Sequence, residues 1–513
     1  MSDWTSGYVA DIGYTHGFYR ELTPAILAFA ALAAGIRAPD VAAPLSYCEL
    51  GCGQGFSANV LAAANPHIRF HATDFNPSHV AGARDLAAKG GLGNISFYDT
   101  PFAEFSAEPG LPQAFDIIAL HGIYSWISPE NRRHIIDFIS RRLRVGGVVY
   151  VSYNCLPGWA AAAPMRHLMA LHARAHGGPT AGRIEPALGF VQRVQKANAG
   201  YFRAAPGLAQ RLEQIKAQDR RYLAHEYFND AWQLFYHSDV AAEMGAARLS
   251  YLGSAHLLEQ VDAINLSSEQ QEILAGLGDP SLRETVRDFM TNAQFRRDIY
   301  VKGPLPISAR VQHGAWQEQR FALSSRREDI EAKVRGPLGE ASLQAEVYEP
   351  VLERLSTGPM DLRELLAGES VSRLGISRVR QALMVLVGIG HVQPCLPARG
   401  DAERTGSVRD FNRAVMSEAR STGTLGAVAS PVTGGGIGAG RFQQLFLLAL
   451  AEGHGKPEAW AEFAWRTLEG QGERLRKEGR ILDAAEDNLA ELRAEAQRFA
   501  QTQLPLLRTL GVA

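Results

Sequence analysis

The fold is decided by residues 47–56, whose sequence is YCELGCGQGF. An acid, Glu49, is followed by Gly51, Gly53 and Gly55, which join a short apolar run to a helical one. Glycine lets the backbone turn tightly and approach a ligand closely, where a side chain would clash. The stretch therefore predicts a strand-to-helix turn at which the backbone contacts a ligand.

A second acid, Asp74, ends the strand-like run at residues 68–73. It lies about 20 residues beyond the glycines, which is the usual distance to a carboxylate that accepts from both ribose hydroxyls of an adenosine ligand. The order Glu-x-Gly-x-Gly-x-Gly differs from the dinucleotide pattern, which has two residues between its last two glycines. An ordinary glycine-rich turn is the alternative, because such motifs are weak without the later acid.

The length and charge of the chain set limits on its class. With 513 residues it is too long for one hydrophobic core, so we expect roughly two to four domains. The formal net charge is −2, and no block of lysines and arginines stands out as a track for phosphates. These features argue against a dedicated nucleic-acid binder.

The four cysteines, Cys48, Cys52, Cys155 and Cys395, show no spacing typical of a zinc site, so we expect no metal. Unpaired cysteines favour a reducing, cytoplasmic setting. The first residues lack the features of a signal peptide, and the longest apolar stretch, at residues 26–36, is shorter than the roughly 20 residues of a membrane-spanning helix. That stretch is expected to form a helix packed on a sheet.

After the glycine turn, the pattern alternates between strands and helices, as in a parallel sheet. Helices are expected at residues 57–64, 78–89 and 129–143, and strands at residues 94–98, 115–120 and 147–153. The predicted fold is a doubly wound, Rossmann-like α/β sheet with its ligand over the carboxyl ends of the strands.

Aromatic and hydrogen-bonding side chains follow two of these strands. The first loop contains His121, Tyr124 and Trp126, and the second, together with the end of its strand, contains Tyr153, Asn154 and Trp159. Such side chains can sandwich a flat ligand and form a channel. The alternative is that the tryptophans only cover the edge of the sheet and that His121 only packs, since no carboxylate partner for it is visible.

Several motifs together resemble bacterial class I S-adenosylmethionine-dependent methyltransferases that carry an appended methyltransferase regulatory domain. They are residues 49–55, Asp74, HGIYSW at 121–126 and VSYNCLPGW at 151–159, and the resemblance continues at 225–228, 296–300 and 430–437. It therefore covers most of the chain. Some members of this group, the rickettsial type, are protein lysine methyltransferases that act on outer-membrane proteins.

The resemblance implies S-adenosylmethionine as the cofactor and assigns residues to its site. The cofactor-binding residues would be Glu49, Gly51, Gly53, Gly55, Asp74, Phe75, Asp99 and His121. The substrate-binding residues would be Tyr14, Trp126, Tyr153, Asn154 and Trp159, and the catalytic residues His121 and Tyr124. Asp99 departs from the family pattern, because residues 100–102 occupy the stretch in which the acid that takes the adenine amino group often lies.

Tyr8, Tyr14, Thr15, His16 and Tyr19 precede the first core helix, where related enzymes often have a lid over the donor. An aromatic staple that anchors the N-terminus is the alternative interpretation. The residue pattern thus leaves a lid and an anchor equally open.

The remaining domains are expected at 183–310, mainly helical and regulatory or substrate-binding, at 311–400, similar to a winged helix, and at 401–513, helical; the methyltransferase domain would be 1–176. Arg296, Arg297 and Lys302 are interpreted as a solvated face or as contacts to an acidic substrate. A glycine-rich loop at 434–440 lacks the lysine of a phosphate-binding loop and is expected to be a flexible or close-packed turn.

The predicted function is methyl transfer from S-adenosylmethionine, with protein lysine as one candidate acceptor. The alternatives are a small-molecule methyltransferase of secondary metabolism and a non-catalytic protein that senses S-adenosylmethionine. The expected partners are an acceptor protein or small molecule, and a second copy of the chain in a homodimer. No specific nucleic acid and no membrane insertion are expected.

Overall fold

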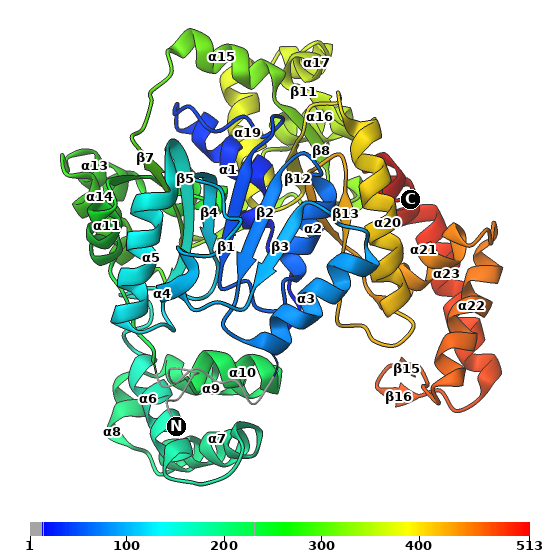
Figure 1. The fold of residues 1–513 in the computed structure, drawn as a ribbon, viewed down its shortest axis with the longest axis horizontal. Coiled ribbons are helices and arrows are strands. Elements are labelled where there is room, and N and C mark those ends of the chain that lie inside the picture. Colours follow the sequence, from blue (N-terminus) through cyan, green and yellow to red (C-terminus); the bar gives the residue numbers. More distant parts are fainter. Residues whose placement is uncertain (1–12, 14, 230) are drawn as a thin grey trace.

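The computed structural model describes residue 13, residues 15–229 and residues 231–513. Its centre is a seven-stranded sheet with the order β3-β2-β1-β4-β5-β7-β6 (Figure 1). The strands are β1 (Ser46–Leu50), β2 (Arg69–Thr73), β3 (Ile95–Tyr98), β4 (Phe115–Leu120), β5 (Leu143–Asn154), β6 (Leu249–Ser254) and β7 (Phe295–Lys302). The first five are parallel, and β7 is antiparallel to both β5 and β6. The predicted doubly wound sheet is confirmed.

Five helices accompany the parallel strands. They are α1 (Pro24–Ala33), α2 (Phe56–Ala64), α3 (Pro77–Lys89), α4 (Phe102–Phe105) and α5 (Pro129–Arg142). Helix α3 is capped by the side chain of Asn76, which accepts from the backbone N–H of Ser78. Helix α2 is buried along all of its nine residues, so it must be covered on the side away from the sheet as well.

Strands β6 and β7 complete the sheet from a segment that was expected to be mainly helical. Arg296 in β7 is 6% exposed and pairs with Asp298, at 2.9 Å, and with Asp288, at 2.5 Å. Lys302 donates to the carbonyls of Ser140 and Leu143. The expectation of a solvated basic face is therefore wrong for Arg296, because paired charges allow a basic residue to lie inside the sheet.

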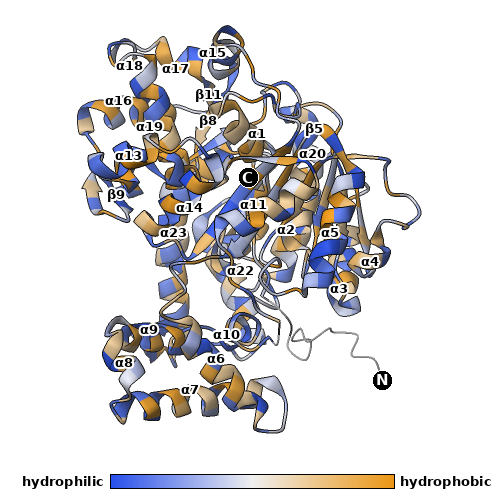
Figure 2. Ribbon diagram, turned by 90° about the vertical axis from the view of Figure 1, so that its left-hand side faces the viewer, coloured by the Kyte–Doolittle hydropathy of each residue, from blue (hydrophilic) through white to orange (hydrophobic). Residues whose placement is uncertain are grey.

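A helical insertion leaves the sheet after β5 and lies beyond the carboxyl ends of the strands, at the bottom of Figure 1. It comprises α6 (Ala163–Arg174), α7 (Thr180–Lys196), α8 (Gly200–Ala204), α9 (Gly207–Lys216) and α10 (Arg220–Tyr227). Figure 2 shows hydrophilic and hydrophobic residues alternating along α7, as in an amphipathic helix. The insertion has a hydrophobic cluster of its own, with buried members that run from Trp159 to Tyr227.

The insertion starts and ends at one point of the sheet. Cys155 forms a parallel bridge with Phe235, the backbone N–H of Leu156 donates to the carbonyl of Phe235, and the N–H of Phe235 donates to the carbonyl of Asn154. After it, helices α11 (His237–Ala246), α12 (Asp262–Asn265), α13 (Ser268–Ala275) and α14 (Pro280–Thr291), with the short helix η2 (Leu257–Gln260), surround β6 and β7.

The chain from residue 309 onward begins with a small α+β unit. Its helices are α15 (Ala309–Glu318), α16 (Ala345–Ser356), α17 (Leu362–Leu366), α18 (Glu369–Ser372) and α19 (Ile376–Gly388). Its three-stranded sheet has the order β11-β8-β12, formed by β11 (Met360–Asp361), β8 (Arg320–Leu323) and β12 (Val392–Cys395), and a hairpin is added by β9 (Lys333–Gly336) and β10 (Gly339–Ser342). The winged-helix designation stays a prediction.

The last part is mainly helical, as expected, with α20 (Asp401–Glu418), α21 (Arg441–Ala451), α22 (Pro457–Gly470) and α23 (Ala485–Thr509). The short strands are β13 (Ala427–Ser430), β14 (Gly435–Gly438), β15 (Arg476–Lys477) and β16 (Arg480–Ile481). The glycine-rich loop is close-packed, since a Cβ at Gly436 would lie 2.9 Å from the ring of Phe18.

These two C-terminal parts form a further layer over the sheet. Residues of α1 and of the sheet share one hydrophobic cluster with α15, β8 and α19, and residues of α2 share another with α20 to α23. The core is thus continuous from the sheet into the C-terminal region, and α1 and α2 lie between the two.

Candidate active site

A pocket opens at the carboxyl ends of β1, β2 and β4, where the fold predicts a ligand. Seven of the expected site residues line it: Glu49, Gly51, Gly53, Gly55, Asp74, Phe75 and His121. Further lining comes from Thr15, Gly17, Tyr19, Cys52, Gln54, Phe56, Ser57, His79, Phe102, Gly122, Ile123 and Ile127. The motif residues are thus brought together, with an apolar wall that the motifs did not include.

The turn at residues 51–55 requires glycine for its own packing against neighbouring side chains, as well as for the close approach of a ligand. Gly51, Gly53 and Gly55 have φ angles of +73°, +53° and +66°, which favour glycine strongly. A Cβ at Gly51 would lie 2.6 Å from the Cγ2 of Ile123, and one at Gly55 would lie 2.5 Å from the Cβ of Ala83. A side chain at Gly51 or Gly55 would therefore disturb the fold of the site itself.

Asp74 is held in place by the turn and by the start of α3. Its Oδ2 accepts from the backbone N–H of Gly53 at 2.9 Å, and its Oδ1 accepts from the N–H of Asn76 at 3.0 Å. The Nδ1 of His79 lies 3.3 Å from the same Oδ1. The carboxylate is 7% exposed and faces the pocket, as a ribose-binding acid should.

Glu49 is a buried carboxyl group with an unused oxygen. It is 4% exposed, and its Oε2 has no hydrogen-bond partner among the described residues. Burial, and secondarily the charge of Asp74, raise the pKa of Glu49 to about 8. A buried acceptor without a partner favours a cationic donor as its ligand, because leaving such a group unpaired is costly. The ammonium group of an amino-acid ligand fits this position.

His121 lies between two tyrosines. Its ring centroid is 3.8 Å from that of Tyr19, and its Nδ1 is 2.8 Å from the hydroxyl oxygen of Tyr150. Burial is the main cause that lowers the pKa of His121 to about 4, with an additional contribution from Arg297. At neutral pH the ring is uncharged, and it is a weak base for an ammonium group.

The N-terminal strap, residues 15–22, crosses the pocket. The hydroxyl of Ser57 accepts from the N–H of Tyr19 at 3.1 Å and donates to the carbonyl of Gly17 at 2.9 Å. Thr15 and Tyr19 line the pocket, as a lid would, whereas Tyr8 and Tyr14 lie outside the described residues. The middle of the strap is thus tied to Ser57, in the first turn of α2.

Two of the expected site tyrosines are instead parts of the core. Tyr124 and Tyr153 are fully buried and do not line the pocket. The hydroxyl of Tyr124 donates to Glu243, and that of Tyr153 donates to Asp298 at 2.7 Å. Both hydroxyls thus face partners outside the pocket, and the place of these tyrosines on the acceptor side stays a prediction.

The other expected residues outside the pocket are Asp99, Trp126, Asn154 and Trp159. Asp99 is half-exposed and lies 3.8 Å from Arg84, and Phe102 lines the pocket in its place. Trp126 is 4% exposed. The N–H of Asn154 donates to Ser125, and Trp159 packs against Tyr227 and Trp232 of the insertion.

Sequence reasoning missed His79, although it contacts Asp74 directly. It lies in the first turn of α3, five residues after the acid, and this spacing has no known motif. Ile123 and Ile127 were also missed, because apolar residues in a loop give no periodic signal. Only the fold shows that they face the glycine turn.

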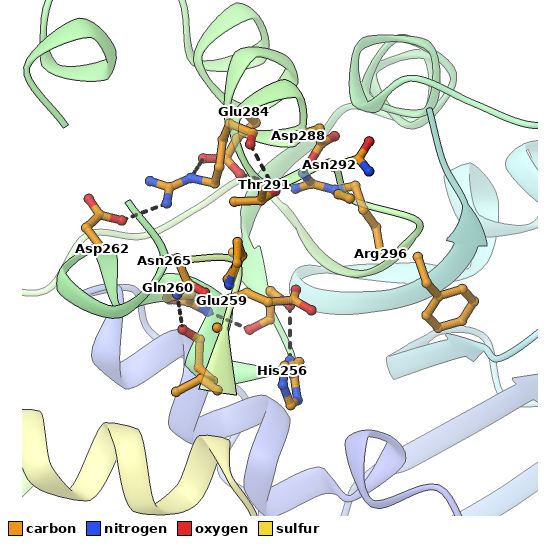
Figure 3. Close-up of a pocket in the computed structure, with 18 of the residues that line it drawn as sticks. His256, Glu259, Gln260, Asp262, Asn265, Glu284, Asp288, Thr291, Asn292 and Arg296 are labelled. Carbon is orange, nitrogen blue, oxygen red and sulfur yellow. Dashed lines mark hydrogen bonds and ion pairs between the residues drawn. The ribbon is translucent and has the colours of Figure 1, made fainter. Parts of the chain in front are cut away.

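A second, larger cavity of about 780 Å³ lies at the β6 end of the sheet (Figure 3). It is lined by η2, α12, α14 and the turn between β9 and β10. Arg287 of α14 pairs with Asp262 at 2.6 Å, and Arg296 pairs with Glu284 at 3.2 Å. Most charges that face this cavity are thus paired with one another.

Two family models match parts of the chain. A family model described as a methyltransferase domain matches residues 48–149, and one described as a predicted methyltransferase regulatory domain matches residues 219–302. An uncharacterized protein of Synechocystis is 44% identical over 510 residues, which are 99% of this chain and 100% of that protein. An uncharacterized protein of Rickettsia prowazekii is 27% identical over 316 residues, which are 60% of this chain and 56% of that protein.

Among solved structures, PKMT2 from Rickettsia typhi in complex with AdoHcy superposes with a TM-score of 0.70 at 17% identity. The match covers 95% of this chain and 98% of that one, so the fold is shared over nearly the whole length. In the part of this chain that the structure describes, no helix has the length and apolar character needed to cross a membrane. Within the same residues, no group of histidines, cysteines and acids has the arrangement of a metal site.

Proposed function

The chain belongs to the class I S-adenosylmethionine-dependent methyltransferases that carry a methyltransferase regulatory domain, and from this premise we propose that it methylates lysine side chains of proteins. The observation that supports a protein acceptor is the fold shared with PKMT2 over nearly the whole chain, including the insertion and the C-terminal layer. These appended parts provide far more surface than a small acceptor needs.

The donor site is proposed from the groups that can still accept a hydrogen bond. We place the ribose of S-adenosylmethionine at Asp74 and its ammonium group at the unpartnered Oε2 of Glu49. The backbone of the turn at residues 51–55 lies close to the donor, and Phe75 and His121 border it. When bound, the donor supplies a methyl group already activated by its sulfonium.

The acceptor must lose a proton before it can attack, because a lysine ammonium has no free electron pair. The pocket favours this loss. Burial in it lowers the pKa of His121 and raises the pKa of Glu49, and each shift favours the uncharged form of the side chain. The same environment would lower the pKa of a lysine that enters it. We assign to His121 a role in shaping the acceptor side, since a base with a pKa near 4 takes a proton from an ammonium poorly.

Transfer of labelled methyl groups tests this proposal. The purified protein is incubated with methyl-labelled S-adenosylmethionine and separate protein, nucleic-acid and metabolite pools, with the Asp74→Ala variant as the control. We expect label in the protein pool and methyl-lysine after complete hydrolysis. Label only in metabolites or nucleic acid would contradict the protein acceptor, and tight donor binding without any product would favour a sensor.

Two further expectations belong to this proposal. A cytoplasmic location is supported by four free cysteines, which persist in reducing compartments. A homodimer is expected as well, and sedimentation equilibrium at several protein concentrations measures it. A mass equal to one chain at every concentration would exclude the dimer.

A further inference from the structure

The carboxylate of Asp74 already accepts three hydrogen bonds from the protein. Its Oδ2 accepts one, from the N–H of Gly53, and its Oδ1 accepts two, from the N–H of Asn76 and from His79. A carboxylate has about four acceptor positions, two on each oxygen. Among the residues that the structure describes, one position therefore remains, and it is on Oδ2.

The hydrogen on the ring of His79 can be placed from its neighbours. The Oδ1 of Asn76 accepts from the backbone N–H of Ser78 at 3.0 Å, which can only donate, so the amide orientation of Asn76 is fixed. The Nδ2 of Asn76 then faces the Nε2 of His79 at 3.4 Å. Because an amide nitrogen only donates, Nε2 accepts and the ring hydrogen lies on Nδ1, toward Asp74.

His79 is positioned to compete with the donor for Oδ1. It lines the pocket, is 4% exposed and has both ring nitrogens engaged in this network. A ribose that used both oxygens of Asp74 would have to place a third donor on Oδ1. A ribose that used Oδ2 alone would leave the network intact.

We propose that Asp74 accepts a single ribose hydroxyl, through Oδ2, and that His79 keeps the other hydroxyl away from Oδ1. His79 is then a residue that determines how the enzyme recognises the ribose of its donor. This inference rests on the proposed place of the ribose at Asp74. It differs from the two-hydroxyl contact that the sequence motif predicts.

Deoxy analogues of the product test the inference in the unmodified protein. Calorimetric titration with S-adenosylhomocysteine and with its 2′-deoxy and 3′-deoxy forms gives three dissociation constants. We expect one analogue to bind at least about tenfold more weakly than the parent, as for a lost hydrogen bond to a charged group, and the other to differ by less than about threefold. Similar losses for both analogues would overturn the inference.

Two substitutions of His79 show whether this residue causes the asymmetry. His79→Leu frees the second position on Oδ1, so both analogues should then bind about tenfold more weakly than the parent. His79→Asn places an amide near the position of Nδ1 and should restore the wild-type asymmetry. Asymmetry that persists in His79→Leu would overturn the role of His79.

The Asp74→Ala variant tests separately whether the ribose lies at Asp74 at all. If the ribose lies at Asp74, the variant should bind the parent compound at least about tenfold more weakly and should no longer distinguish it from the deoxy analogues. If the variant keeps wild-type affinity for the parent, the ribose lies elsewhere, and the proposed site and the inference both fail. Equal losses for both analogues in the wild type, with a weakened Asp74→Ala, refute the inference alone.

Discussion

The charge of Glu49 is expected to depend on whether the donor is bound. Its pKa is about 8 in the folded protein, against an ordinary value of 4.5. Because this pKa is raised, Glu49 contributes stability below about pH 4.5 that is lost as the pH rises toward about 8. An ammonium group at Oε2 would reverse the preference and favour the ionised carboxylate.

We therefore expect the affinity for S-adenosylhomocysteine to rise with pH, by up to about tenfold per unit between pH 6 and 8. Calorimetric titration at three pH values measures this dependence. In Glu49→Gln, which cannot ionise, the pH dependence should disappear. A flat profile in the wild-type protein would show that Glu49 does not contact the ammonium group.

Substitution of Tyr124 should affect stability and leave donor binding nearly unchanged. Tyr124→Phe removes the hydrogen bond to Glu243 and should lower the free energy of unfolding by about 1–2 kcal/mol. Tyr124→Ala also leaves a cavity and should cost about 3–5 kcal/mol. Urea unfolding and titration with S-adenosylhomocysteine are the measurements, and a Tyr124→Phe variant with native stability but reduced affinity would return this residue to the site.

Among individual residues, the sequence predicted the glycines and the acids that line the pocket. It did not predict where the aromatic residues lie. The glycines and Asp74 are recognisable because their spacing within one βαβ unit is fixed by the ligand. The hydroxyl partners of Tyr124 and Tyr153 lie 119 and 145 residues away along the chain. No local pattern could show that these tyrosines face the core.

Among the elements, the N-terminal strap is tied to α2 by the hydroxyl of Ser57. Ser57→Ala removes its hydrogen bonds to Tyr19 and Gly17, each worth about 0.5–1.5 kcal/mol. We expect dissociation of S-adenosylhomocysteine to become about fivefold faster or more, as measured by stopped-flow displacement. Ser267→Ala removes a capping hydroxyl of α13 far from the pocket and is the matched control. Equal rates in both variants would argue against the strap as a lid.

Strand β7 is held by a network of buried charges around Asp298, which is 0% exposed. Burial alone would raise the pKa of Asp298, but Arg296 and His237 hold it below its ordinary value. Its contribution to stability is thus present at neutral pH and is lost as the pH falls through the lowered pKa. The ion pairs around Asp298 should consequently persist in mild acid and be lost only at low pH.

Asp298→Ala leaves Arg296 without one of its buried partners and should lower the free energy of unfolding by about 3–5 kcal/mol at pH 7. Urea unfolding measures this loss. Asp262→Ala removes a more exposed partner of Arg287 and should cost at most about 1 kcal/mol. Equal losses in the two variants would contradict the role of burial.

The parallel half of the sheet could be predicted because apolar strand-like runs alternate with helical runs after the glycine turn. Strand β7 could not, since its charged residues Arg296, Arg297 and Asp298 suggest a solvated surface. Arg296 pairs with Asp288 of α14, and Arg297 pairs with Glu21 and Glu259, so their partners lie in other elements. Charge pairing across elements is a tertiary property and leaves no periodic trace in the sequence.

Across the whole molecule, we expect the sheet to need the C-terminal layer in order to fold, because the two share hydrophobic clusters. A fragment of residues 1–310 would expose the outer sides of α1 and α2, which are buried against that layer. We expect this fragment to be insoluble and unable to bind S-adenosylhomocysteine, and residues 311–513 to restore binding when produced together with it. Solubility and titration measure both outcomes.

A smaller deletion elsewhere provides the contrast. Replacing residues 160–231 with a short glycine and serine linker removes the insertion, which has its own hydrophobic cluster. This variant should stay soluble and bind the donor. A soluble, donor-binding fragment of residues 1–310 would contradict the dependence on the C-terminal layer.

Because the insertion leaves and re-enters the sheet at bonded neighbours, Cys155 and Phe235, it can change in evolution almost independently of the rest. A lineage can lengthen, shorten or replace this segment by a single genetic event without shifting the register of any strand. The part of the protein that binds the methyl donor would then be inherited with little change. The choice of what is methylated could diverge between descendants of one ancestral gene.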